Sequence, residues 1–504
     1  MYSYADFSAH SFILEWEAKY HLANSALDRR DDLLRECFAS LEKDLSLLGV
    51  TAIEDRLQDG VPETIQLLRA AGIKVWMLTG DKRATAIQIA QTCNMISSEP
   101  AGETISLDFT TKNEQGKEPD FMEVRTQLET QHKTVLDRRA GLTSGVDGDE
   151  GGSRSPLSII IDGASLRRVL DDPASILAFM DLCMLAEVVV CCRVTPLQKS
   201  RMVEMVNSRG HTTLAIGDGG NDVSMIQKAN IGVGIKGREG LQAARSADYC
   251  IGKFRYLSRL ILIHGRHAYR RTAFVALYCF YKSVFLATGQ ALYQFYCGFS
   301  GTSLLNTFSL STYNILFTGL PILFYTLDKD MADGTVFKFP KVYQESVKGL
   351  SFNRNRFLLW IIRSIIQSTI AFYVVLACFQ DINADPQGRS HGETNFALAV
   401  FTSAIVIQTV TLIIESHGLT IYNWVIILGT AAFFFIAMQV IASVPSLGMY
   451  GAADELYNDP IYYFSFIAAA AGALILPLAL KYYSFNYRPK MSELMYVPCH
   501  PQSC

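Results

Sequence analysis

The stretch LAIGDGGNDVSMIQKANIGVGI, Leu214 to Ile235, places an apolar run directly before an acidic, glycine-rich turn. The segment TTLAIGDGG is typical of a strand that ends in a turn, NDVSMIQKAN of a helix, and IGVGI of a second strand. Strands and helices that alternate in this way indicate a parallel sheet. Because ligands bind at the carboxyl ends of the strands in such sheets, the turn GDGGND is a candidate site.

The same alternation extends over residues 45–251 and predicts a Rossmann-like α/β domain with a parallel, doubly wound sheet. The expected strands lie in LLGVTAI, IKVWMLTGD, LSIIIDG and EVVVCCRV, and the expected helices in VPETIQLLRAAG, KRATAIQIAQTC and PLQKSRMVEMVNSRG. Residues 97–156 break the rhythm because they are rich in Gly, Ser and acidic residues, so we expect a mobile polar insertion there.

The residue types in GDGGND suit a magnesium and phosphate site. Asp218 and Asp222 would supply carboxylates to the cation, and Asn221 would donate to a phosphate oxygen. The same residue types are also common at an ordinary capped helix start, so this turn alone leaves both interpretations open.

Two further segments favour phosphate chemistry. In MLTGDK, Thr79 offers a hydroxyl, and Gly80 and Asp81 precede a helix whose free N–H groups attract anions. In CCRVTPLQKSRM, Arg193 and Lys199 provide cations at and just beyond another strand end. Three phosphate-suited segments in one α/β domain predict a site for phosphoryl transfer.

After Arg271 the chain becomes strongly apolar, and its mean hydropathy over all 504 residues is +0.18. Membrane spans need about 20 apolar residues. Six segments qualify: Thr272–Tyr296, Ser309–Leu327, Phe357–Phe379, Asn395–Ile414, Ile421–Val444 and Ile461–Leu480. The net charge of −3 argues against binding of nucleic acid.

The charges and cysteines predict an orientation. Basic residues gather before the first span, after the second and after the sixth, so we expect the α/β domain and the C-terminal tail to be cytoplasmic. The eleven cysteines show no metal-binding spacing, as expected of reduced thiols. Lys282 lies near the middle of its span, where a cation is costly and by default functional. The alternative is that its side chain reaches toward the membrane interface. The first two spans lack Asp and Glu, which argues against an ion pump.

The α/β part resembles the haloacid-dehalogenase type of phosphoryl-transfer domain. Four blocks closely resemble the phosphorylation domain of P-type ATPases, specifically the type IV phospholipid-translocating family, the lipid flippases. They are LLGVTAIEDRLQDGVPETIQLLRAAGIKVWMLTGDK, VVVCCRVTPLQKSRMVEMV, LAIGDGGNDVSMIQKANIGVGI and SADYCIGKFRYLSRLILIHGRHAYRR. The resemblance runs from about Trp16 through the sixth span, and it departs from the family at Ala84, Gly220 and Ser283.

The resemblance implies a fold, a site and partners. It implies a connector over 1–44, a haloacid-dehalogenase-like phosphorylation domain over 45–265, an all-α six-helix transmembrane domain over 266–484 and a tail over 485–504. Catalytic roles fall on Thr79, Lys199 and Asp222, phosphate contacts on these residues together with Gly80, Asp81, Arg193 and Asn221, and magnesium on Asp218 and Asp222. Lys282 and Asn314 would lie along a lipid path. ATP, Mg²⁺, a phospholipid and an accessory β-subunit of the CDC50 type are the expected partners, in the plasma membrane or an endomembrane such as the Golgi or endosome.

One required feature is absent from the 504 residues. A P-type pump needs an aspartate that becomes phosphorylated, in a DKTGT-like motif, and the sequence contains no such motif. We therefore expect this sequence to be the C-terminal half of a flippase. A truncated gene prediction is the expected cause, and the half alone would be inactive. The alternative is a catalytically dead membrane module that binds nucleotide or a full-length pump. A membrane-tethered phosphatase would need another aspartate as nucleophile.

Overall fold

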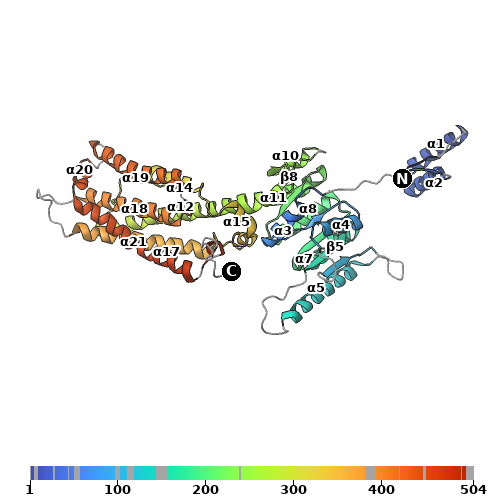
Figure 1. Cartoon of the computed structure of the whole chain (residues 1–504), viewed down its shortest axis with the longest axis horizontal. Helices are drawn as coiled ribbons and strands as arrows, with labels where there is room; N and C mark the ends of the chain where they lie inside the picture. The colour runs from blue at the N-terminus through green and yellow to red at the C-terminus, as the bar shows by residue number, and fades with distance from the viewer. Residues whose placement is uncertain are drawn as a thin grey trace. The chain divides into compact units, whose positions relative to one another are not determined.

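The structure is a computed structural model (Figure 1). It describes residues 2–4, 10–26, 29–43, 45–49, 57–96, 103–110, 119–143, 156–237, 240–380, 392–418, 420–445, 450–487, 489 and 491–494. The chain divides into two compact units, Met1–Asp59 and Gly60–Cys504.

The first unit combines a short antiparallel ladder with two helices. Strands β1 (Tyr2–Tyr4) and β2 (Ser46–Gly49) pair antiparallel, and α1 (His10–Ser25) packs on α2 (Arg30–Leu41). The indole nitrogen of Trp16 donates to the backbone oxygen of Cys37 at 2.9 Å. The strand expected in LLGVTAI is therefore corrected: its described part, β2, pairs with β1 and does not join the parallel sheet. Residues 50–56 lie outside the described residues.

The second unit begins with an α/β part that contains two parallel sheets where we expected one. The first has the order β3-β6-β5-β4, and the second the order β7-β8-β9. The strands are β3 (Met77–Leu78), β4 (Glu103–Leu107), β5 (Leu157–Asp162), β6 (Val188–Cys192), β7 (Leu214–Gly217), β8 (Ile231–Ile235) and β9 (Tyr249–Ile251). All five residues of β6 are buried, which explains its continuous apolar run VVVCC.

Helices cover these strands and begin at recognisable sequence signals. Pro62, Pro173 and Pro196 stand in the first turns of their helices, where a missing N–H costs little. The helices are α3 (Val61–Ala70), α4 (Arg83–Thr92), α6 (Gly163–Asp171), α7 (Pro173–Leu185), α8 (Pro196–Ser208), η1 (Gly220–Asp222), α9 (Val223–Lys228) and α10 (Gln242–Ser246).

Part of the predicted insertion is regular structure, which corrects the expectation for those residues. Strand β4 pairs along its whole length with β5, and α5 (Phe121–Thr143) packs against α7. Val124, Leu128 and Val135 recur at helical spacing and are buried in the same core as β5. The acidic and glycine-rich residues around them hid this apolar face, and residues 97–102, 111–118 and 144–155 lie outside the described residues.

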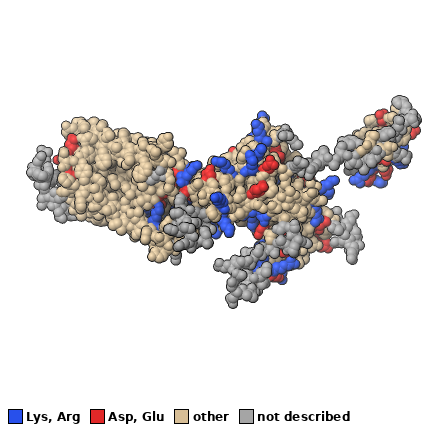
Figure 2. All heavy atoms as spheres, viewed as in Figure 1, with Lys and Arg blue, Asp and Glu red and all other residues tan. Residues whose placement is uncertain are grey.

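Within the described residues, five helices are long and apolar enough to cross a membrane. They are Tyr256–Tyr296, which joins α11 (Tyr256–Ser258), the π-helix η2 (Arg259–Gly265) and α12 (Arg266–Tyr296), then α17 (Arg354–Gln380), α18 (Glu393–Glu415), α19 (Ile421–Ala442) and α21 (Pro460–Tyr487). In Figure 2 the visible face of this helical bundle carries few charged residues.

The second predicted span, 309–327, is not one continuous helix and is not among these five. It consists of α13 (Thr307–Thr312), the π-helix η3 (Tyr313–Phe317) and α14 (Gly319–Tyr325). The N–H of Thr318 bonds the oxygen of Tyr313, five residues back, so the regular ladder is interrupted there. Pro321 lacks an N–H and cannot restore the ladder across the break.

Three short elements that follow α14 pack against the α/β part. They are α15 (Asp333–Lys338), η4 (Pro340–Tyr343) and α16 (Gln344–Val347). Leu68 of α3, Leu262 of η2, Val336 of α15 and Val342 of η4 belong to one buried apolar cluster. The remaining helices are α20 (Ala452–Tyr457) and α22 (Met491–Leu494).

Candidate functional site

The centre of the candidate site is the turn between β7 and α9. Asp222 ends the 3-10 helix η1, and its side chain folds back over the end of β7. A Cβ at Gly217 would lie 2.4 Å from the Cβ of Asp222, so only glycine fits beneath this carboxylate. Gly217 is therefore needed for the close contact with this neighbouring side chain.

Lys199 reaches the same carboxylate from α8. Its Nζ donates to Oδ1 of Asp222 at 2.8 Å, and the two side chains are only 11% and 15% exposed. A capping box starts α8: the Thr195 hydroxyl accepts from the N–H of Gln198, and the Gln198 side chain accepts from the N–H of Thr195. This cap fixes the first turn of α8, which carries Lys199.

Asp218 and Asn221 stand beside this pair in the sequence with exposed side chains. Asp218 is exposed at the end of β7, and Asn221 is exposed in η1. Neither side chain forms a hydrogen bond or ion pair with any residue that the structure describes. One free carboxylate beside a lysine-paired carboxylate fits a hard cation that keeps several waters, which is how Mg²⁺ is usually held.

The loops after β3 and β6 form the second part of the site. The hydroxyl of Thr79 donates to Oδ2 of Asp81 at 2.8 Å and accepts from the N–H of Asp81 at 3.1 Å. The N–H of Arg193 donates to the oxygen of Asp81 at 3.0 Å, and the N–H of Val194 donates to the oxygen of Thr79 at 3.1 Å. These bonds join the two loops, while the side chain of Arg193 and residue Gly80 stay exposed.

Internal bonds thus hold part of the sequence-predicted residues together in two groups, and the side chains of Asp218 and Asn221 take no part in the described bonds. Lys199 pairs with Asp222 in the first, and Thr79, Asp81 and the backbone of Arg193 join in the second. Thr195 and Gln198 position Lys199 and were not predicted as site residues. The T-x-x-Q spacing of TPLQ is a capping-box signal that would have revealed them.

A polar centre lies inside the helical bundle. Lys282 of α12 is 7% exposed, and its Nζ donates to Oγ1 of Thr318 at 3.0 Å and to the backbone oxygen of Asn314 at 3.4 Å. Nζ also lies 5.9 Å from the centroid of the Tyr313 ring. Among the described residues, no carboxylate lies within ion-pair distance of Lys282. The side chain of Asn314 is exposed, so these two residues meet only through the Asn314 backbone.

Two neighbours that were not predicted from the sequence, Tyr313 and Gln408, hold this centre in place. The hydroxyl of Tyr313 donates to the backbone oxygen of Lys282 at 2.8 Å and accepts from Nε2 of Gln408 at 2.6 Å. Gln408 lies on α18 and is 1% exposed. The glutamine within the apolar run of α18 indicates a buried hydrogen bond, because a polar group in a membrane helix needs an internal partner.

Comparison with protein families matches three parts of the chain. Residues 244–490 match the family described as phospholipid-translocating P-type ATPase, C-terminal. Residues 6–120 and 199–246 match families described as haloacid dehalogenase-like hydrolase.

Similar curated proteins cover nearly all of the chain. It is 40% identical over 482 residues to a phospholipid-transporting ATPase 2 of Arabidopsis thaliana, covering 96% of this chain and 41% of that protein. A phospholipid-transporting ATPase VD of Macaca fascicularis is 37% identical, with 92% of this chain and 67% of that protein covered. The human protein of the same name is 38% identical, with 92% and 32% covered. The chain thus spans less than half the length of the Arabidopsis and human relatives.

Proposed function

Because the chain belongs to the phospholipid-translocating P-type ATPases, we propose that it supplies part of an ATP-driven flippase. The intact enzyme moves a phospholipid from the exoplasmic to the cytoplasmic leaflet through an aspartyl phosphate, whose aspartate is not in these 504 residues. The observation that carries this proposal is the Lys199–Asp222 pair beside the exposed carboxylate of Asp218.

In this proposal each residue of the site acts by position and charge, as phosphoryl transfer requires. Lys199 and Arg193 neutralise phosphate charge, and Thr79, Gly80, Asp81 and Asn221 contact the nucleotide or the transferred group. Asp218 and Asp222 would hold Mg²⁺, which screens the charge of the phosphate oxygens when bound. The Lys199–Asp222 bond keeps both groups in place before any ligand arrives.

The two sheets each have an edge at which a strand from another segment could pair, and such a strand could carry the phosphorylated aspartate. In the described part of the chain, β3 pairs with a strand only on its β6 side and β7 only on its β8 side. Leu78 of β3 packs against the apolar cluster that contains Ala215 of β7. A parallel strand between β3 and β7 would end near both Thr79 and Asp218, where its aspartate could accept a phosphoryl group.

In the membrane, we assign Lys282 and Asn314 to the path of the lipid or its border. The support is a buried ammonium group without a described carboxylate partner, at a break between η3 and α14. An accessory β-subunit of the CDC50 type, a cytoplasmic α/β part and a plasma-membrane or endomembrane location are further parts of the proposal. The domain boundaries follow the same scheme, with a phosphorylation domain to about residue 265 and the membrane domain to about 484.

The decisive experiment joins this sequence to a segment that carries a DKTGT motif and measures ATPase activity in phospholipid vesicles. We expect stimulation by a phospholipid, and a loss of roughly 100-fold in Lys199→Met and in Asp222→Asn. Stimulation by a metal ion alone, without any effect of lipid, would reject the flippase assignment.

The alternative is a catalytically dead module that binds nucleotide or a full-length pump, and the absence of a DKTGT motif from the sequence favours it. The purified 504-residue chain should then form no acid-stable phosphoenzyme with labelled ATP and Mg²⁺. It should also change the activity of a full-length pump when the two are expressed together, whereas an unchanged pump would remove the support for this alternative.

A further inference from the structure

Helix α21 contains a proline that leaves one backbone carbonyl open. Because Pro477 has no N–H, it cannot donate to the oxygen of Ala473, which lies four residues earlier in the same helix and is buried. A buried carbonyl without a donor is unfavourable, and membrane helices tolerate proline where a neighbouring helix supplies the missing bond. Gly472 brings this part of α21 close to α17, since a Cβ there would lie 3.2 Å from Cγ2 of Ile370.

Gln367 of α17 supplies the missing donor. Its Nε2 donates to the oxygen of Ala473 at 3.1 Å. Because a carbonyl can only accept, the amide nitrogen must face Ala473, and the amide oxygen then faces the other way. That oxygen, Oε1, accepts from the hydroxyl of Tyr281 on α12 at 2.6 Å, and both side chains are buried. The amide of Gln367 therefore forms a bridge from α21 to α12.

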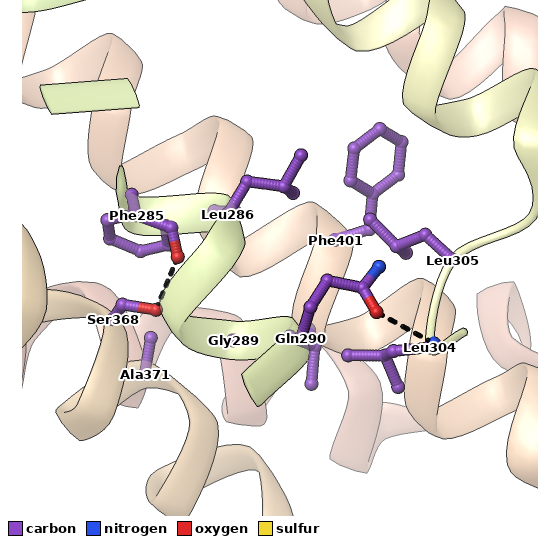
Figure 3. Close-up of a pocket in the computed structure, with 11 residues that line it drawn as sticks. Phe285, Leu286, Gly289, Gln290, Leu304, Leu305, Ser368, Ala371 and Phe401 are labelled. Atoms are coloured by element: carbon purple, nitrogen blue, oxygen red, sulfur yellow. Dashed lines mark hydrogen bonds between the residues drawn. The ribbon is translucent and has the colours of Figure 1, made fainter. Parts of the chain in front are cut away.

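Two serines of α17 hold α12 at the same level. The hydroxyl of Ser364 donates to the backbone oxygen of Tyr281 at 2.6 Å. One turn later the hydroxyl of Ser368 donates to the backbone oxygen of Phe285 at 2.7 Å, as Figure 3 shows. The cavity beside this contact measures only about 20 Å³, room for about one water, so the helices are closely packed here.

The bridge ends on the residue that directly precedes Lys282. Successive side chains of a helix point about 100° apart, so Tyr281 and Lys282 face different neighbours. Tyr281 bonds Gln367, whereas Nζ of Lys282 bonds Oγ1 of Thr318 at 3.0 Å. A rotation of α12 about its axis would break the bond of Tyr281 and carry Lys282 away from Thr318. The bridge therefore limits where the ammonium group can lie.

We propose that Gln367 is a positioning residue for Lys282. By joining Tyr281 to the carbonyl that Pro477 leaves open, it fixes the rotation of α12 and keeps the ammonium group in place. Gln367 acts through Tyr281, because its two amide groups bond only Tyr281 and Ala473 among the described residues. The consequence for lipid transport rests on the proposed role of Lys282 in the lipid path, whereas the bridge itself does not.

The test measures how readily the full chain, in detergent micelles, is methylated at Lys282 by formaldehyde and a borohydride. Mass spectrometry of the peptide that contains Lys282 gives the rate. Gln367→Met keeps the length of the side chain but removes its amide, and Tyr281→Phe removes only a hydroxyl. Each variant should raise the rate about three- to tenfold, as expected when one buried hydrogen bond is lost. The double variant should react no faster than either single one, because both changes break the same bridge.

A matched control separates positioning from a general loosening of the bundle. The hydroxyls of Thr402 on α18 and Tyr462 on α21 lie 2.8 Å apart in a buried hydrogen bond that is not part of the bridge. Thr402→Val should lower the melting temperature about as much as Gln367→Met does. Its Lys282 should nevertheless be methylated at the rate of the wild type.

The role of Pro477 is tested by stability. Pro477→Ala provides an N–H that can bond the oxygen of Ala473 within α21, so that oxygen no longer depends on Gln367. Gln367→Met should lower the melting temperature by roughly 2–4 °C in the wild-type background and by clearly less beside Pro477→Ala. Gln408→Met is the control, because Gln408 bonds Tyr313 at 2.6 Å and should cost the same in both backgrounds.

Three results would overturn the proposal. They are an unchanged methylation rate in Gln367→Met and Tyr281→Phe, the same increase in Thr402→Val, or a loss of stability in Gln367→Met that does not depend on Pro477. None of these measurements needs ATP or lipid movement, so failure here leaves the proposed flippase function untouched.

Discussion

Nζ of Lys199 lies 2.8 Å from Oδ1 of Asp222, although the two residues are 23 positions apart in the sequence. The lysine comes from the first turn of α8 and the carboxylate from the end of η1. Both side chains are largely buried, so each depends on the other for its charge balance.

Replacement of Lys199 tests this dependence. Lys199→Met leaves the Asp222 carboxylate without its partner, and we expect the free energy of unfolding of the α/β part to fall by about 2 kcal/mol. Asp222→Asn should recover part of that loss in the double variant, because the unpaired charge is then gone. Chemical denaturation followed by tryptophan fluorescence measures each variant, and strictly additive losses would contradict a direct interaction.

Gly217 and Gly219 provide a matched pair of substitutions. In Gly217→Ala the new Cβ would lie 2.4 Å from the Cβ of Asp222, so the carboxylate must move and the protein should lose roughly 1–3 kcal/mol of stability. In Gly219→Ala the nearest atom is 4.0 Å away, so little change is expected. Thermal unfolding checks both variants, and equal melting temperatures would show that Asp222 adapts freely.

Cysteine reactivity should follow burial in the α/β part. Burial raises the pKa of the Cys183 and Cys191 thiols well above the ordinary value, so both stay protonated and shielded at mildly alkaline pH. Cys250 is exposed on β9. We expect a maleimide to modify Cys250 in the native chain but Cys183 and Cys191 only in denaturing detergent. Peptide mapping by mass spectrometry reports this, and early modification of Cys191 would contradict the buried position of β6.

Thr318 holds the buried ammonium group of Lys282. Thr318→Val removes an acceptor 3.0 Å from Nζ, and we expect a loss of about 1 kcal/mol in the stability of the bundle. Thr312→Val is the control, because the hydroxyl of Thr312 bonds the oxygen of Phe308 within its own helix at 2.8 Å. Thermal unfolding in detergent distinguishes them, and equal effects would mean that the bond to Lys282 adds nothing.

The ionised carboxylate of Asp328 should add to the free energy of unfolding at neutral pH, and this contribution should disappear in acid. Burial alone would raise its pKa, but hydrogen bonds from the His417 side chain and from the N–H groups of Gly418 and His417 outweigh burial and lower the pKa. A lowered pKa in the folded state stabilises the protein above the pKa of an unfolded aspartate, about 3.9, and this contribution is lost as the pH falls through the folded value. Asp328→Asn should therefore be less stable than the wild type at neutral pH, with a gap that narrows below about pH 4. A gap that does not change with pH would contradict this assignment.

Short-range sequence patterns account for the local elements of this protein. Strand and helix periods, the turn GDGGND and the apolar runs are set by neighbours in the chain, so β7, α9, β8 and five membrane-length helices were predictable. Polar side chains that follow apolar strands also made the main site residues predictable, namely Asp218, Asp222, Thr79 and Lys199.

Which of these elements meet depends on contacts between residues far apart in the sequence. Long-range contacts pair Lys199 with Asp222, divide the strands into two sheets and put β2 beside β1. They also give Lys282 the backbone of Asn314 but not its side chain, and leave the amide nitrogen of Gln290 without a described partner. Periodicity reports which face of an element is buried, but a partner far along the chain depends on how the elements pack.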